Sequence, residues 1–271
     1  MSHPAIDHLR VRPGEPARLG ERATRDDLGL DDKDEGKAIL GDLLERLYDL
    51  QRELWAEDER AVLLVLQGMD TAGKDGTIRR VMSGVNPQGV SVASFKKPSD
   101  LELDHDYLWR VHAVCPRRGS IGIFNRSHYE DVGVVRVNGW ISEEVAEQRL
   151  RQIRDFERHL AENGTVIRKV FLHIGKDEQR ERLQERIDTP EKHWKFNLGD
   201  LDTRAQWDDY MAAYDAALTA TSTDEAPWYV VPADRKWVRD VAVARLLVDT
   251  LEGMDLQTPP PDPDLAGLVI E

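Results

Sequence analysis

Residues 63–82 read LLVLQGMDTAGKDGTIRRVM, in which an apolar run leads into a glycine, four further residues and then glycine-lysine. This order predicts a buried strand, a glycine-rich loop and the start of a helix, as in a phosphate-binding P-loop. Backbone N–H groups of such a loop approach phosphate oxygens, and the helix N-terminus favours negative charge. A chance match in a strand–helix turn, where glycine is common, is the alternative. The residues expected at the phosphates are Gly68, Thr71, Ala72, Gly73, Lys74 and Gly76.

Two carboxylates in this loop are unusual. The position after the loop lysine commonly carries a Ser or Thr that binds Mg²⁺, but here it is Asp75. A carboxylate there could hold Mg²⁺ directly or through water. Asp70 lies inside the loop, where an acid repels phosphate unless a metal or an attacking group lies between them. We therefore interpret Asp70 as a metal ligand or general base, with a solvated turn aspartate as the alternative.

A second motif ends another predicted strand. In residues 121–137, IGIFNRSHYEDVGVVRV, the strand ends at Asn125, Arg126 and Ser127. Ligands of open α/β sheets bind outside the carboxyl ends of the strands. Asn125 stands where an aspartate usually holds Mg²⁺, and the guanidinium of Arg126 suits phosphate. Alternatively, Arg126 pairs with a structural carboxylate such as Asp131.

A third motif is basic. In residues 180–197, RERLQERIDTPEKHWKFN, Arg182 and Arg186 are four apart and share one helix face. A proline ends the helix, and Lys192 and Lys195 follow it. Beside a phosphate loop, this pattern predicts a lid that closes over a phosphate chain and excludes water. The alternative is a solvated amphipathic helix whose own glutamates pair with the arginines.

Short apolar runs alternate with helical patterns, which predicts a parallel sheet with helices on both faces. We divide the chain into an extended N-terminal arm (1–35), ordered in part if it packs on a partner, a kinase domain (36–254) with a lid at about 177–200, and a C-terminal tail (255–271). The predicted strands are 61–67, 89–95, 120–125, 165–174 and 227–233. The predicted helices are 36–59, 75–83, 100–112, 142–162, 177–186, 200–222 and 235–253.

Composition narrows the function classes. The net charge of −14 over 271 residues argues against binding of nucleic acid or anionic membranes, but not against a polyanion in a locally basic cleft. The longest apolar run, 61–66, is too short to span a bilayer, and the first residues lack a signal-peptide core. Cys115 is the only cysteine, which excludes an intrachain disulfide and a thiolate metal site. We expect a cytoplasmic protein.

The three motifs together resemble the polyphosphate kinase 2 family. A fourth stretch, residues 221–240, TSTDEAPWYVVPADRKWVRD, resembles it as well. The resemblance covers about residues 35–254, and Asp75 after the loop lysine matches the habit of the family. It implies a P-loop kinase fold of the thymidylate-kinase type, with five parallel strands sandwiched by helices and a helical lid. It also implies Mg²⁺, a homodimer or homotetramer, and phosphoryl transfer between inorganic polyphosphate and adenine nucleotides.

The second motif resembles the third subclass of that family, which phosphorylates AMP as well as ADP. Asn125, His128, Glu130 and Asp131 stand where much of the family has an aspartate followed by RSWYNR. The missing aspartate leaves Asp70 as the expected metal ligand. The resemblance implies catalytic roles for Asp70, Lys74, Arg126 and Arg186. It implies nucleotide or polyphosphate binding by the P-loop residues with Asp75, and by Asn125, Tyr129, Glu130, Asp131, Arg182, Lys192 and Lys195.

Two other functions use the same features. An ATP-dependent nucleoside monophosphate kinase shares the fold and the lid, but normally keeps Ser or Thr after the loop lysine. A non-catalytic phosphate-binding protein has little need of Asp70 beside a magnesium site.

Overall fold

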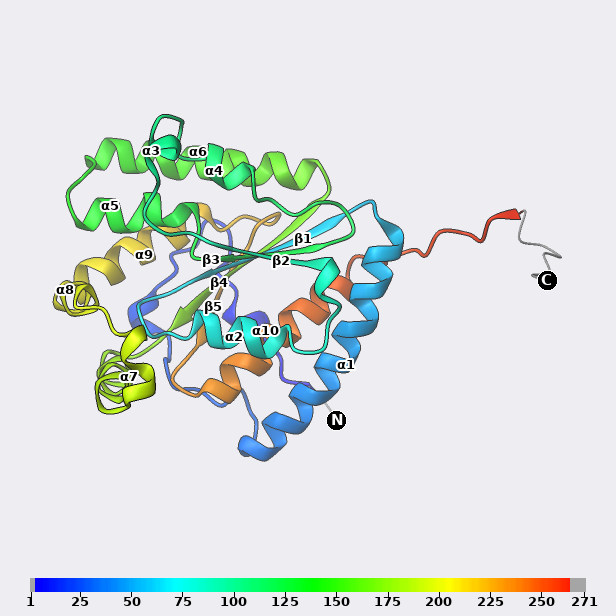
Figure 1. Ribbon diagram of the computed structural model, residues 1–271, viewed down its shortest axis with the longest axis horizontal. Coiled ribbons are helices and arrows are strands. Elements are labelled where there is room, and N and C mark those ends of the chain that lie inside the picture. Colours follow the sequence, from blue (N-terminus) through cyan, green and yellow to red (C-terminus); the bar gives the residue numbers. More distant parts are fainter. Residues whose placement is uncertain (1–2, 264–271) are drawn as a thin grey trace.

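Five short apolar segments form one parallel sheet, which confirms the predicted fold class (Figure 1). The structure is a computed structural model that describes residues 3–263. All seven residues of β1 are buried, as expected for a strand covered on both faces. The strand order is β2-β3-β1-β4-β5. The strands are β1 (Ala61–Gln67), β2 (Val90–Ser94), β3 (Ile121–Asn125), β4 (Thr165–His173) and β5 (Trp228–Pro232).

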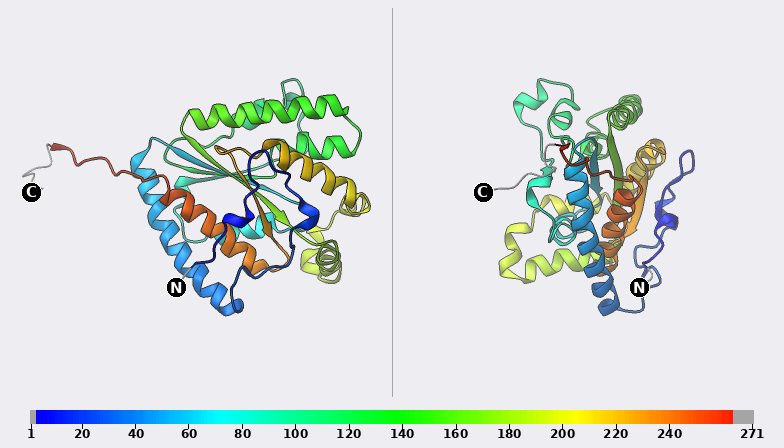
Figure 2. Two further views of the ribbon diagram at one scale, coloured as in Figure 1. Left: turned by 180° about the vertical axis from the view of Figure 1, so that it is seen from behind. Right: turned by 90° about the vertical axis from the view of Figure 1, so that its right-hand side faces the viewer.

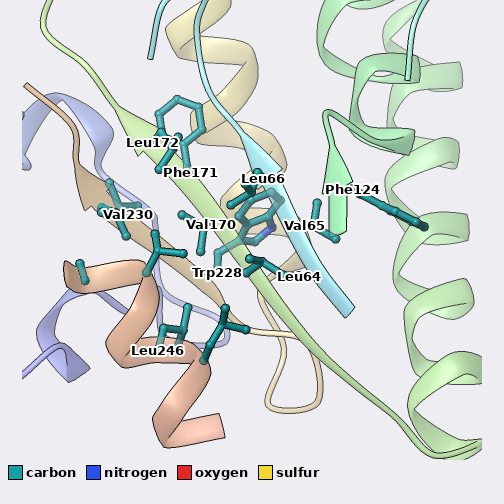
Figure 3. Packing of buried hydrophobic residues seen from close by; sticks show 14 of the residues in the cluster. Leu64, Val65, Leu66, Phe124, Val170, Phe171, Leu172, Trp228, Val230 and Leu246 are labelled. Atoms are coloured by element: carbon teal, nitrogen blue, oxygen red, sulfur yellow. The ribbon is translucent and has the colours of Figure 1, made fainter. Parts of the chain in front are cut away.

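Helices cover both faces of the sheet (Figure 1). One face carries α1 (Lys33–Glu57), α2 (Lys74–Val81) and α10 (Lys236–Glu252), and the other carries α5 (Gly133–Val137), α6 (Glu143–Glu162) and α9 (Trp207–Thr221). In the core, Leu246 of α10 lies below β5, while Phe124 of β3 points toward the helices of the opposite face (Figure 3). The remaining helices are α3 (Asp100–Leu103), α4 (Trp109–His112), α7 (Lys176–Asp188) and α8 (Gly199–Ala205).

Two predicted helices are each divided in the structure. The segment 100–112 forms α3 and α4, because the Asp106 carboxylate accepts from the backbone N–H of Leu108 and starts a new turn. The segment 200–222 forms α8 and α9, which meet at Gln206. Helix α5 is an addition, since its five residues are too short for a periodic pattern to indicate.

The N-terminal arm, which we expected to be ordered in part if it packs on a partner, packs on its own chain. Val11 donates its backbone N–H to Trp228 at 2.8 Å, and Arg10 forms an antiparallel bridge with Tyr229 of β5. The arm crosses the back of the molecule (Figure 2, left). Its buried side chains follow no helical or strand period, so the sequence carried no signal for this packing; they are Ile6, Leu9, Val11, Ala17, Leu19 and Leu30.

The bounds of the first and the last predicted helix shift slightly. Helix α1 begins at Lys33 because the Asp32 carboxylate caps it, accepting from the N–H groups of Asp34 and Glu35. The tail leaves α10 after Glu252, and its last residues, 264–271, lie outside the described part of the chain. Within residues 3–263, every helix is too short or too polar to cross a bilayer.

A buried ion pair joins the sheet to α6. Lys169 of β4 donates to the Glu157 carboxylate at 2.5 Å, to the Tyr129 hydroxyl at 2.9 Å and to the Thr221 carbonyl at 2.8 Å. Burial alone would raise the pKa of Glu157, but Lys169 and His128 outweigh it, so that this pKa is lowered. The pair holds the turn that follows β3 against α6 and α9.

We predict that Lys169→Met lowers the free energy of unfolding by about 3–5 kcal/mol, because it leaves the Glu157 carboxylate buried without its partner. Urea unfolding at pH 7 measures the loss. Arg158→Met is the matched control, because Arg158 also pairs with an acid of α6 (Asp155, 3.0 Å) but is exposed, and its loss costs about 1 kcal/mol or less. Equal effects of the two substitutions would contradict the buried-pair interpretation.

Candidate active site

The loop between β1 and α2 is shaped by close backbone contacts. Gly68 and Gly73 have φ angles of +150° and +105°, in the region that favours glycine. A Cβ atom on Gly68 would lie 2.7 Å from the Leu172 carbonyl oxygen, and one on Gly73 would lie 1.9 Å from Nη1 of Arg239. Gly68 is therefore required by its approach to the Leu172 backbone, and Gly73 by its left-handed conformation.

Arg182 supports this loop from behind. Its guanidinium donates to the carbonyls of Thr71 and Ala72, to those of Ala233 and Asp234, and to the Glu178 carboxylate. The side chain is 7 % exposed. All five of its N–H donors therefore have protein acceptors. We predicted that Arg182 binds the substrate. In the structure it lies beneath the loop instead, because its side of α7 faces the loop carbonyls.

Lys74 lies at the base of the loop, as predicted. Its Nζ donates to the carbonyl of Gly68 at 2.7 Å and to that of Met69 at 3.3 Å. Burial lowers the pKa of Lys74, and the nearby Arg126 lowers it further. Within residues 3–263 the hydrogen-bond acceptors of this ammonium are neutral carbonyls, so an arriving anion would meet a positive charge without a bonded carboxylate.

Asp70 and Arg126 meet across the sheet edge. Register pairs Leu66 of β1 with Asn125 of β3, so the residues that follow both strands lie together. The Arg126 guanidinium contacts the Asp70 carboxylate at 2.9 Å. The alternative partner, Asp131, instead pairs with Arg110 at 3.0 Å. Arg126 has a φ angle of +61°, an uncommon conformation for a non-glycine residue that often marks a functional site.

A cavity of about 140 Å³ opens above this pair. Glu130 lines it with Asp70 and Arg126, and burial raises the pKa of Glu130 while Arg126 and Lys74 oppose that rise. Helix α9 supplies two aromatic walls that the sequence analysis did not identify. The complete lining is Gly68, Met69, Asp70, Arg126, Glu130, Val134, Thr203, Tyr210 and Tyr214.

The two positions that depart from the common P-loop pattern contact each other. Asn125 donates its side-chain amide to the Asp75 carboxylate at 2.5 Å. In the common pattern the loop position is a hydroxyl and the strand position is an acid. Here the loop position is the acid and the strand position is neutral, so the pair still holds one carboxylate. Each substitution therefore compensates for the other, which the two motifs did not indicate when taken separately.

The predicted lid comprises α7, a short turn at Pro190–Lys195 and α8. Arg186 donates to the Lys195 carbonyl at 3.0 Å and pairs with Asp200 at 3.1 Å. Burial and the nearby Asp70 raise the pKa of Asp200. Asp200 of α8, which we did not predict, thus lies on the side of the lid that faces Asp70 of the loop; its only signal in the sequence was its place at the start of a predicted helix.

The basic side chains at the tip of the lid are partly paired. Lys192 contacts the Glu185 carboxylate at 2.5 Å, and Lys195 Nζ lies 4.9 Å from the centre of the Trp194 ring. Trp194 is itself 79 % exposed. Lys195 is exposed and Lys192 is partly exposed, so both can be reached from solvent.

Two other predicted site residues point into the core. The Tyr129 hydroxyl bonds to Glu157 and Thr221, and the residue is 2 % exposed. Asp131 is buried against Arg110. Tyr129 and Asp131 are close to Arg126 and Glu130 in sequence, but they lie on the inner side of the turn after β3. They therefore position this turn rather than line the cavity.

We predict that Arg182→Lys lowers the free energy of unfolding by about 1–3 kcal/mol, because an ammonium cannot replace a planar fork that reaches both loop carbonyls and the Ala233 carbonyl. Arg180→Lys on the same helix is the control and should change it by less than about 0.5 kcal/mol, because Arg180 is exposed. Urea unfolding without substrate measures both. An unchanged free energy of unfolding in the Arg182→Lys protein would contradict this supporting role and favour the predicted role of Arg182 in substrate binding.

Comparison with known proteins shows the family of the chain. The profile of the Polyphosphate kinase 2 family matches residues 30–259. An AMP/ADP-polyphosphate phosphotransferase of Meiothermus ruber is 56 % identical over 88 % of each chain, and an ADP-polyphosphate phosphotransferase of Rhodopseudomonas palustris is 47 % identical over 94 % of this chain and 92 % of its own. The crystal structure of polyphosphate kinase 2 from Arthrobacter aurescens superposes with a TM-score of 0.93 at 46 % identity, covering 98 % of this chain and 94 % of that one. The chain belongs to the polyphosphate kinase 2 family.

Proposed function

We propose that the chain transfers phosphoryl groups from inorganic polyphosphate to AMP and to ADP in the cleft above the P-loop. The observation that carries this proposal is the meeting of Lys74, Arg126 and Asp70 at the adjoining ends of β1 and β3. The Meiothermus ruber relative, described as acting on both AMP and ADP, supports the choice of acceptors.

The residues of the cleft fit a magnesium ion. Asp70 and Asp75 offer hard carboxylate oxygens on the loop, and Mg²⁺ in phosphoryl-transfer sites uses one or two carboxylates together with substrate phosphates and water. Within residues 3–263 no cluster of three acids, histidines or cysteines could hold a metal alone, which agrees with a site shared with substrate. Asp70 is the proposed ligand. When bound, Mg²⁺ would neutralise charge on the phosphate oxygens.

The cations of the cleft would exchange their present partners for phosphate. Lys74 would leave the carbonyls of Gly68 and Met69, and Arg126 would turn from Asp70 toward the transferred group. Phosphoryl transfer needs positioning and neutralisation of charge, and needs no nucleophile from the protein, because the acceptor phosphate oxygen attacks. Arg186 would add its charge when the lid closes.

A single cleft can serve both acceptors if the nucleotide shifts by one phosphate relative to the loop. Lys192 and Lys195, at the tip of the lid, would hold the rest of the polyphosphate. An ATP-dependent nucleoside monophosphate kinase remains the alternative that shares this architecture. A cytoplasmic location and a homodimer or homotetramer remain predictions.

We expect ADP to form first and ATP later when AMP is the only acceptor, with polyphosphate and Mg²⁺ supplied and ATP absent. Chromatography of the nucleotides over time measures this. Lys74→Ala is the control and should lower the rate about 10²–10³-fold, because it removes a preorganised positive charge. An inert AMP with active ADP would contradict the double acceptor, and AMP phosphorylated only by ATP would favour the alternative.

We also expect Asp70→Asn to raise the Mg²⁺ concentration needed for half-maximal activity by at least about tenfold, because it replaces a charged oxygen ligand with a neutral one. A magnesium titration of initial rates gives this value. Asp177→Asn is a matched control on the exposed side of α7 and should keep the wild-type titration. An unchanged magnesium titration in the Asp70→Asn protein would contradict this assignment and favour Asp75 as the metal ligand.

A further inference from the structure

A second cavity lies at the other end of the sheet. It has a volume of about 450 Å³ and lies between the N-terminal arm, the start of β4, β5 and α10. Arg168 is close to the amino end of β4, whereas the active site is at the carboxyl ends of the strands. The size is that of a site for a small organic ligand. Its lining is His3, Pro4, Ala5, Ile6, Asp7, Arg168, Tyr229, Arg245, Leu246, Asp249 and Thr250.

Arg168 is a positively charged residue of this cavity that has no carboxylate partner among the described residues. Its Nη1 donates only to the neighbouring Ile167 carbonyl at 2.8 Å, and no carboxylate of residues 3–263 lies within ion-pair distance of it. Two neighbouring arginines are each compensated: Arg10 pairs with Asp224, and Arg245 pairs with Asp249. Burial lowers the pKa of Arg168, and Arg10 lowers it further against the opposing effect of Tyr229.

Other donors around the cavity are also unused. Nε of Arg245 is buried without a hydrogen-bond partner, as is Nε of Arg10, whose backbone bridges to Tyr229 on the same wall. An oxyanion matches two guanidinium groups in geometry and charge.

We propose that this cavity binds a small phosphate monoester of the size of a nucleoside monophosphate, with its phosphate on Arg168 and Arg245. One uncompensated guanidinium suits a ligand of one or two negative charges and does not suit a long polyphosphate, because Asp7 and Asp249 already pair with arginines and no further free positive charge is offered by the described lining. The apolar walls of Ile6, Leu246 and Tyr229 give the organic part of the ligand a contact surface. Orthophosphate alone carries the same head group but would leave these walls without a contact.

Binding measurements on full-length protein test the proposal, with AMP and orthophosphate as separate probes. In a Lys74→Ala background, which weakens the active site, we expect AMP to bind with a dissociation constant that Arg168→Met raises about ten- to hundredfold, the effect of losing hydrogen bonds to a charged group. Arg158→Met removes an exposed, paired arginine and should leave binding unchanged. Isothermal calorimetry supplies the constants and the stoichiometry.

Two further measurements separate the cavity from the active site. Ala5→Trp, at an exposed position of the lining, should block AMP without changing the core. AMP should also slow amide hydrogen exchange at residues 5–7 of the arm in the Lys74→Ala protein, and Arg168→Met should abolish that protection. Equal AMP binding by the Arg168→Met, Ala5→Trp and parent proteins would overturn the proposal. If orthophosphate bound as tightly as AMP, the organic part of the ligand would contribute nothing to binding. That result would overturn the proposal of a phosphate monoester and indicate a site for a simple anion.

Discussion

The phosphate loop depends on one guanidinium group. Arg182 takes the carbonyls of Thr71 and Ala72 on one side and those of Ala233 and Asp234 on the other, so it joins α7, the loop and the start of α10. In a trans peptide the N–H points away from the carbonyl. By fixing the Ala72 carbonyl inward, Arg182 turns the N–H of Gly73 outward, toward the place where a phosphate would lie. Arg182 thus orients the phosphate-binding N–H group without contacting the phosphate itself.

Local signals predicted the sheet and the loop, because buried parallel strands are short apolar runs and the loop glycines are adjacent in sequence. They placed Asp70, Lys74 and Arg126 together because strand ends converge at one edge. Periodicity puts Arg182 on a helix face without saying what that face meets. Proximity to Arg126 in sequence likewise could not separate Glu130, which lines the cavity, from Asp131, which does not.

Carboxylates already hold several of the cations around the cleft. Arg126 contacts Asp70, Arg186 contacts Asp200, and Lys192 contacts Glu185. An incoming anion must therefore compete with acids of the protein itself, and a weakly charged one gains little from the exchange. A dense polyanion can replace several carboxylates at once. The acidic composition of the chain is therefore compatible with a polyanionic substrate and acts against weaker ligands.

The contact between the arm and β5 has a consequence for synthesis of the chain. Val11 and Arg10 pair with Trp228 and Tyr229, which leave the ribosome only after the other four strands. Until then the first residues of the arm lack the strand on which they pack, and the outer edge of β4 is open. Closing contacts of such high sequence separation is slow. The nascent chain is therefore most exposed to misassociation just before its last strand emerges.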